Sequence, residues 1–238
     1  ILVLFSGLAA PFYSSLYGMI FLFGISLYMM DSFRLGISIN LKKAIIVWLS
    51  FSVIVFIAQR VFTPMFIFRH IVFIFTAYVT VSLFREQLFH KLESILYFFA
   101  SVSLFFWAWQ LISLDTITEF GRLIGVYVSD GDNKKEYSNF ILYTINYGRY
   151  APALIPRNAG FCWEPGPFAN FLSIAIMINF FRNNFKIVLS RKLIILFVTL
   201  LTTASTAGIL AVGTLVLYSA SFGYRGLKKY LLISAFGA

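Results

Sequence analysis

The chain has 238 residues, of which 60% are hydrophobic and 12% are charged, and its formal net charge is +10. An ordinary soluble domain is about 45–50% apolar and about 25% charged, and a single soluble core of this size cannot hide so large an apolar excess. The composition therefore excludes a soluble enzyme and a disordered tail, and it predicts a polytopic membrane protein. A nucleic-acid partner would need a basic patch on a soluble face, and because the sequence offers none we expect no such partner.

Both ends of the chain lie inside apolar runs. The first begins at Ile1, and the last extends from Tyr230 to Ala238. We therefore expect an internal fragment of a longer protein, and no basic region that would mark a signal peptide precedes Ile1. The single cysteine, Cys162, excludes an intramolecular disulfide.

Long apolar runs predict the membrane crossings, because a crossing helix needs about 20 largely apolar residues. Five such runs are separated by charged or polar segments: 12–30, 44–59, 65–84, 94–114 and 166–181. A further uncharged run, 193–224, has Lys and Arg on both flanks, so both flanks favour the cytoplasmic side and the run is expected to go out and return. Its turn is expected at 202–208. The two legs are short, so the hairpin is expected to dip into the membrane, with small residues that let the legs approach closely.

The distribution of Lys and Arg predicts the orientation. The segments 31–43, 85–93, 182–192 and 225–229 hold 12 of the 19 basic residues, whereas 60–70 and 115–165 hold 7 in a longer total length. Since cytoplasmic loops carry the excess of Lys and Arg, the first group is expected inside and the second outside. The fold class predicted is an all-α transmembrane bundle of about six to eight spans. Its parts are helices in 1–114, an outer loop at 115–165 and further helices in 166–238.

The outer loop holds six of the nine acidic residues. Helical spacing is predicted at 115–128, followed by a solvated turn at 129–136 whose Asp-x-Asp fragment offers too few ligands for a metal site. Aromatic residues then recur every three or four positions, which is typical of one face of a helix; they are Tyr137, Phe140, Tyr143, Tyr147 and Tyr150. This face is expected either to lie at the membrane interface or to stack against sugar rings.

The loop closes on the segment 157–167, RNAGFCWEPGP. Proline suits the first turn of a helix, so Pro165 places Glu164 immediately before the fifth crossing, where the helix dipole stabilises a carboxylate. Arg157 lies seven residues earlier, across a turn that contains Gly160. Arg157 and Glu164 could therefore meet as a salt bridge that pins the loop, or they could serve a substrate.

This segment resembles the motif of bacterial O-antigen and capsule repeat-unit polymerases, which are integral membrane proteins. The resemblance rests on the Arg, the Gly three residues later and the Glu-Pro-Gly at the start of a crossing, here Arg157, Gly160, Glu164, Pro165 and Gly166. The later TTASTAG, at 202–208, is similar to a hairpin turn of the same family. In the related O-antigen ligases the comparable turn more often holds Ser-Arg-Gly, so the absence of Arg here favours the polymerases.

The resemblance implies a glycosyltransferase that joins oligosaccharide repeats carried on undecaprenyl diphosphate, at the periplasmic face of the bacterial inner membrane. No nucleotide sugar, metal or other cofactor is implied, and a chain-length regulator and a flippase are the further protein partners. The alternatives are an O-antigen ligase and a transporter or flippase of lipid-linked sugars. The family usually has a second outer loop with additional Arg or His, and this chain stops before it, so only part of the active site is expected here.

The residues that would carry this chemistry follow from the motif and from the charges on the outer side. Arg157 is expected to stabilise the charge that develops on a diphosphate leaving group, and Glu164 to act as a base, to bind sugar hydroxyls or only to hold Arg157. Arg69 and His70 draw attention because ionisable residues inside a span are costly, although Arg can extend to the surface. The full set expected to bind substrate is Arg69, His70, Arg122, Arg149, Gly160, Trp163, Pro165 and Gly166.

Overall fold

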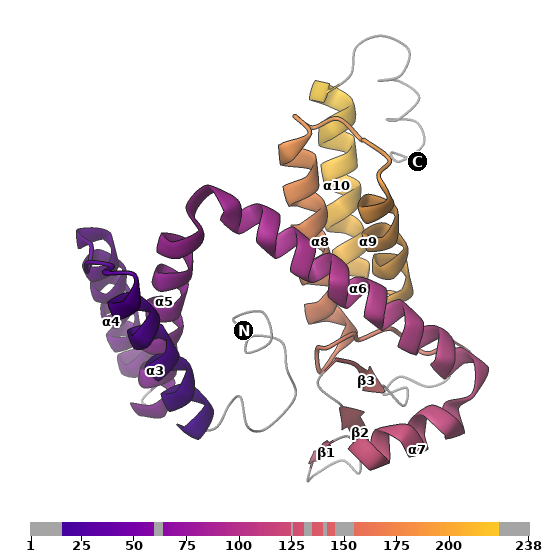
Figure 1. The fold of residues 1–238 in the computed structure, drawn as a ribbon, viewed down its shortest axis with the longest axis horizontal. Coiled ribbons are helices and arrows are strands. Elements are labelled where there is room, and N and C mark those ends of the chain that lie inside the picture. Colours follow the sequence, from indigo (N-terminus) through magenta and orange to yellow (C-terminus); the bar gives the residue numbers. More distant parts are fainter. Residues whose placement is uncertain are drawn as a thin grey trace. The chain divides into compact units, whose positions relative to one another are not determined.

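The computed structural model describes residues 16–59, 64–124, 126–130, 135–139, 142–145 and 155–223. Most of these residues are helical, as the composition predicted (Figure 1). By their contacts they divide into two compact units, the first ending at Leu88 and the second beginning at Phe89. The candidate site lies in the second unit.

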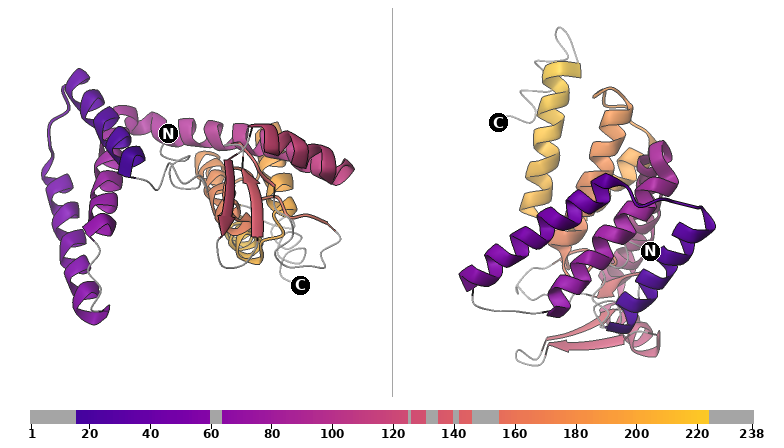
Figure 2. Two further views of the ribbon diagram at one scale, coloured as in Figure 1. Left: turned by 90° about the horizontal axis from the view of Figure 1, so that it is seen from below. Right: turned by 90° about the vertical axis from the view of Figure 1, so that its left-hand side faces the viewer.

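The first unit consists of α3 (Leu16–Ser32), α4 (Ile39–Gln59), α5 (Pro64–Phe84) and the short 3-10 helix η1 (Arg85–Gln87). These helices coincide with the runs predicted at 12–30, 44–59 and 65–84. The helix α5 packs against both α3 and α4 (Figure 2). Polar contacts add to this packing, since Ser26 Oγ donates a hydrogen bond to Thr76 Oγ1 and Tyr78 OH donates one to the carbonyl of Gly36.

The second unit contains five helices. They are α6 (Leu88–Ile112), α7 (Leu114–Ile124), α8 (Pro165–Arg182), α9 (Arg191–Thr202) and α10 (Thr206–Gly223). The helix α8 packs along α9 and along α10, so these three lie side by side (Figure 1). With a rise of about 1.5 Å per residue, α8 is roughly 27 Å long and α9 only roughly 18 Å. The turn predicted within the run 193–224 is found between Thr202 and Thr206, and the first helix, α9, has 12 residues, fewer than the about 20 that a crossing helix needs.

A three-stranded antiparallel sheet interrupts the helices at 126–145. Its strands β1 (Val126–Asp130), β2 (Lys135–Asn139) and β3 (Thr144–Ile145) are adjacent in chain order, and the views of Figure 2 show them side by side. The register pairs the first residue of β1 with the last residue of β2. The helix of 115–128 was therefore predicted too long, because it ends at Ile124 and the chain then turns into a strand.

The aromatic helix expected over 137–150 is wrong in the part of the segment that the structure describes. Tyr137 belongs to β2, Tyr143 precedes β3, and Phe140, Tyr147 and Tyr150 lie outside the described residues. The prediction used only the spacing of the rings. Aromatic and β-branched residues also favour strands, and here the backbone groups of β2 find their partners across the hairpin instead of along a helix.

One helical stretch among the described residues, Ile67–Ile112, is long and apolar enough to cross a membrane, and it includes α5 and α6. Two shorter apolar helices are Leu16–Ser32 and Thr206–Ser219. The core helix of a soluble protein can have the same length and apolar composition as a membrane span.

Helices of the second unit approach closely at Gly208, in the first turn of α10. A Cβ atom built on Gly208 would lie 2.8 Å from Ala169 Cβ of α8 and 2.9 Å from Leu200 Cδ1 of α9. Small residues were predicted at this turn so that the two legs could approach. The structure places a third helix, α8, in the same contact.

We expect Gly208→Ala to destabilise the protein by about 1–3 kcal/mol, because the added methyl group overlaps atoms of two neighbouring helices. Thermal unfolding in detergent measures the loss. Gly213→Ala in the same helix is the matched control, since its Cβ meets nothing within 4 Å, and it should be neutral or stabilising through helix propensity. Equal melting temperatures for the two variants would contradict the packing described here.

Candidate active site

The segment 155–164 is fastened to the helices by the side chain of Asn158, which is fully buried. Its Nδ2 donates hydrogen bonds to Thr202 Oγ1, at 3.0 Å, and to Ser103 Oγ, at 3.3 Å. Asn158 Oδ1 accepts a hydrogen bond of 2.9 Å from the backbone N–H of Gly160. The backbone N–H of Asn158 donates to the carbonyl of Thr202. One amide thus joins the loop to α6 and to the end of α9.

Two further hydrogen bonds connect the loop to its surroundings. The N–H of Thr144, in β3, donates to the carbonyl of Gly160 at 2.7 Å. The indole of Trp107, in α6, donates to the carbonyl of Pro156, also at 2.7 Å. The position of the loop is therefore set by the sheet, by α6 and by the α9–α10 turn together.

Gly160 is required by its backbone and by its neighbours. Its φ is +54°, in the left-handed region that glycine tolerates best. A Cβ atom at this position would lie 2.5–2.7 Å from ring atoms of Phe168, in the first turns of α8. Gly160 was predicted to bind substrate, and the structure assigns it a packing role in the approach of the loop to α8.

Arg157 is half-buried and directed at the α9–α10 turn. Its Nε donates a hydrogen bond of 2.9 Å to the carbonyl of Thr203. The expected salt bridge with Glu164 is not among the ion pairs of the described residues, so Arg157 pins the loop to this turn through a carbonyl instead. A guanidinium has five N–H hydrogens, and this bond uses one of them.

Glu164 is the residue immediately before α8, as the two prolines predicted. It has extended backbone angles, with φ −140° and ψ 156°, and Pro165 and Pro167 occupy the first turn of the helix. The Glu164 side chain is half-buried and does not cap the backbone of α8. Its carboxylate therefore lies at the positive end of the α8 dipole, next to the loop that carries Arg157.

Of the residues between Arg157 and Glu164, all but Trp163 are buried. Phe161 is fully buried and packs on Phe99 and Phe168, with ring centroids 4.6 and 5.6 Å apart. Cys162 is also buried, and burial raises the pKa of its thiol. Trp163 is 43% exposed, so within this stretch it is the large ring that a ligand could reach.

An aromatic cluster lies beneath the sheet, between α6 and α7. Tyr143 is fully buried and stacks on Phe106 with centroids 5.6 Å apart. Its hydroxyl donates a hydrogen bond of 2.6 Å to Gln110 Oε1, and burial raises the pKa of this phenol. Tyr143 is thus a neutral core residue, and it is not part of a sugar-stacking platform.

The other residues predicted to bind substrate belong to several different elements of the chain. Arg69 and His70 belong to α5 in the first unit, where Arg69 lies over the ring of Phe73 and His70 stacks on Trp48. Arg122 lies in α7, and Arg149 lies outside the described residues. Pro165 and Gly166 open α8 directly beside the loop.

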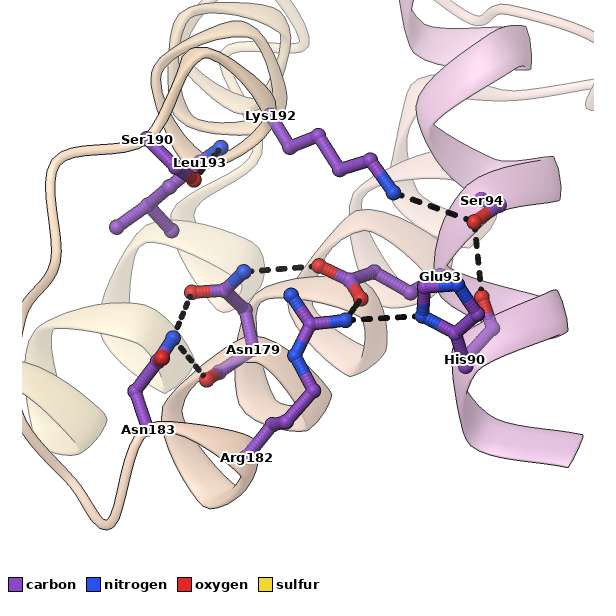
Figure 3. A network of polar contacts seen from close by, with 9 residues as sticks. All are labelled: His90, Glu93, Ser94, Asn179, Arg182, Asn183, Ser190, Lys192 and Leu193. Atoms are coloured by element: carbon purple, nitrogen blue, oxygen red, sulfur yellow. Dashed lines mark hydrogen bonds and ion pairs between the residues drawn. The ribbon is translucent and has the colours of Figure 1, made fainter. Parts of the chain in front are cut away.

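A second polar cluster, at the opposite ends of α8 and α9, was not predicted (Figure 3). Its centre is Glu93 of α6, which is 0% exposed. Arg182 Nη1 donates to Glu93 Oε2 at 2.6 Å, and Asn179 Nδ2 donates to Glu93 Oε1 at 2.8 Å. Both carboxylate oxygens are therefore satisfied by α8.

The rest of this cluster extends the contact between α6 and the start of α9. Arg182 Nη1 also lies 3.0 Å from His90 Nδ1, and Lys192 Nζ donates to Ser94 Oγ at 3.3 Å. In the sequence, these residues indicated only a basic segment on the inner side. Two residues could have indicated the cluster: Glu93, at the edge of an apolar run, and Asn179, inside another. Such polar groups need hydrogen-bond partners when they are buried.

The segment 155–164 carries one arginine whose bond to another described residue uses only Nε, one carboxylate at a helix start and one exposed indole. Such a set can hold an anionic group on the guanidinium and a hydroxyl on the carboxylate. A search of the described residues finds no group of three His, Cys, Asp or Glu side chains that could hold a metal ion.

We expect Gly160→Ala to destabilise the protein by more than about 2 kcal/mol, since the new Cβ meets the Phe168 ring and the backbone is left-handed. Gly166→Ala, six residues later, is the matched control because its Cβ has open space. Chemical unfolding of the two variants measures the difference. If Gly166→Ala were as destabilising as Gly160→Ala, the packing role of Gly160 would be refuted.

We expect Cys162 to react very slowly with maleimides in the native protein, because the thiol is buried and its raised pKa leaves little thiolate, the reactive form. Trp163→Cys in a Cys162→Ser background supplies the neighbouring exposed thiol and should react at the rate of a free cysteine. Between pH 7 and pH 9 the rate at Cys162 should stay low. Labelling of native Cys162 as fast as position 163 would contradict its burial.

Comparison with known proteins adds no family to this geometry: no family model, no curated protein and no solved structure matches the chain.

Proposed function

We propose that this chain is part of a multi-pass protein of the bacterial inner membrane that polymerises lipid-linked oligosaccharide repeats. Its substrates would be oligosaccharides on undecaprenyl diphosphate, and its products O-antigen, capsular or exopolysaccharide chains at the periplasmic face. The growing glycan would leave its lipid diphosphate and join a sugar hydroxyl of the next lipid-linked repeat. The C1–O bond to the diphosphate breaks, the new glycosidic bond forms, and the hydroxyl proton is released.

The observation that carries the proposal is the fixed position of Arg157 against the α9–α10 turn. The loop that contains Arg157 is held by Asn158 on α6 and α9 and by Gly160 against α8. Its guanidinium is anchored through Nε to the Thr203 carbonyl, which leaves its Nη hydrogens for a ligand. A planar cation with paired donors suits a diphosphate, whose negative charge grows as the glycosidic bond breaks.

Glu164 supplies the second role. It is the residue immediately before α8 and is half-buried. Its side chain makes no capping hydrogen bond to the backbone of α8. A carboxylate in this position could accept the proton of the attacking hydroxyl or bind sugar hydroxyls. The exposed Trp163 between the two charges offers a flat apolar face of the kind that sugar rings contact.

The membrane location is supported by the surfaces of the helices. Besides the apolar stretch Ile67–Ile112, α4 carries large apolar side chains that are more than half exposed; they are Ile46, Val47, Phe51, Val53 and Ile54. A soluble monomer rarely exposes so contiguous an apolar face. Lipid is the environment in which such a helix is stable, and six to eight spans in the whole chain is the arrangement we propose.

The polymerase is favoured over a transporter by where the polar groups lie. A translocation path needs polar or ionisable residues along the middle of several helices. In the second unit, Glu164 directly precedes α8, Arg182 is the last residue of α8 and Lys192 is near the start of α9. The middle of α8 thus carries no charged residue.

We expect Arg157→Ala and Glu164→Ala, in the full-length protein, each to abolish long glycan chains while single repeats persist. The gel ladder of glycan length, at equal amounts of inserted protein, measures this loss. Arg157→Lys should also shorten the ladder, because an ammonium keeps the charge but loses the paired donors of the guanidinium.

Lys91→Ala and Glu86→Ala are the matched controls. Each removes an exposed charge far in sequence from the loop and should leave the ladder unchanged. Normal ladders in both Arg157→Ala and Glu164→Ala would refute the assigned site.

A further inference from the structure

We propose that the connection between α8 and α9, residues 183–190, with its flanking cations, is a docking surface for a leaflet of anionic phospholipid. This goes beyond the proposed glycan chemistry, which lies at the other end of α8. It shares with that proposal only the membrane location.

Two of the cations of this connection, Lys186 and Arg191, have no side-chain partner among the described residues. Four cations lie within eleven residues: Arg182, Lys186, Arg191 and Lys192. Arg182 is paired with the buried Glu93, and Lys192 is bonded to Ser94 (Figure 3). Lys186 and Arg191 are both exposed and make no recorded side-chain contact. The single nearby carboxylate therefore leaves a local excess of positive charge.

Two of the residues between these cations, Val188 and Leu189, are apolar and exposed. The segment reads Lys-Ile-Val-Leu-Ser-Arg from 186 to 191. Leu189 is 78% exposed and Val188 is 49% exposed, and Phe181 at the end of α8 is 56% exposed. Apolar side chains bracketed by Lys and Arg are typical of segments that lie at a membrane surface, with the side chains in the acyl boundary and the cations at the phosphates.

The connection is held in a defined shape, so these side chains are presented together. Asn184 and Phe185 have φ of +51° and +58°, a strained conformation for residues other than glycine. Phe185 is held there by its N–H bond to the carbonyl of Phe180 and by Ser219, whose hydroxyl donates to the Phe185 carbonyl. Its ring packs on Phe181 and Tyr218. Ser190 then caps α9 by accepting from the N–H of Leu193.

Anionic lipid is the occupant that satisfies both features. A soluble anion would pair with Lys186 and Arg191 but would leave Leu189 and Val188 in water. An apolar protein surface would cover the leucine and the valine but would leave the two cations without counter-charges. A leaflet that contains phosphatidylglycerol supplies phosphates and acyl chains at the same depth. Lys and Arg near such a surface are attracted by its negative charge.

The test uses a fluorescent label at position 189. The chain with Leu189→Cys is labelled with bimane, while the native Cys162 stays unlabelled because it is buried. It is reconstituted in phosphatidylcholine vesicles with or without 30% phosphatidylglycerol, each containing a lipid with a shallow nitroxide quencher. We expect quenching at position 189 in both bilayers, and at least twofold stronger quenching when phosphatidylglycerol is present.

The charge dependence is tested with the double variant Lys186→Gln and Arg191→Gln. It should remove the difference in quenching at position 189 between the bilayers with and without phosphatidylglycerol. The matched control is Lys42→Gln with Lys43→Gln, two exposed lysines of the first unit, which should leave the difference intact. Equal quenching in the two bilayers, or an equal effect of the control pair, would overturn the proposal. So would a label shielded from both the lipid quencher and aqueous iodide, because protein would then cover the segment.

The outcome is independent of the glycan chemistry. A normal glycan ladder in the Lys186→Gln and Arg191→Gln variant, together with the loss of the lipid preference, is the expected result. If the Arg157 and Glu164 variants left the ladder unchanged, the polymerase proposal would fail while the lipid result stood.

Discussion

The arrangement of the loop end depends on one buried amide, that of Asn158. A buried amide without partners costs several kcal/mol, and here every bond it makes reaches a different part of the chain: α6 at Ser103, the end of α9 at Thr202 and the loop itself at Gly160. Because these partners are far apart in sequence, the amide finds them only when the helices and the loop are assembled. The position of Arg157, one residue earlier, is therefore a consequence of helix packing.

The opposite end of α8 also depends on a buried polar group whose partners lie in another helix, and here that group is a carboxylate. Glu93 is excluded from solvent, and both of its oxygens are occupied by Asn179 and Arg182. Removing one partner of a buried pair is strongly destabilising because the other charge is left uncompensated. α8 is thus fixed at its start by the loop and at its end by α6, which keeps two chemically different surfaces about one helix length apart.

Local signals predicted the elements that local physics controls. Apolar runs and their charged flanks predicted where α3, α4, α5, α6 and α8 lie, and Pro165 predicted the start of α8. The helix prediction failed at 137–139 and 142–145, the part of the aromatic segment that the structure describes. The same aromatic spacing fits a helix face or a strand, and the choice depends on whether β1 is available as a partner. Spacing within one segment carries no information about a second segment.

The sequence by itself determined the apolar character of the chain, the order of its helices and the place of Glu164 at a helix start, because these follow from composition, proline and charge in neighbouring residues. Only the tertiary structure decided that Arg157 bonds the Thr203 carbonyl instead of Glu164. It also decided that Gly160 makes room for Phe168 and that Glu93 meets Arg182. Each of these contacts joins residues that the chain separates, and their partners are chosen by the packing of helices and not by proximity in sequence.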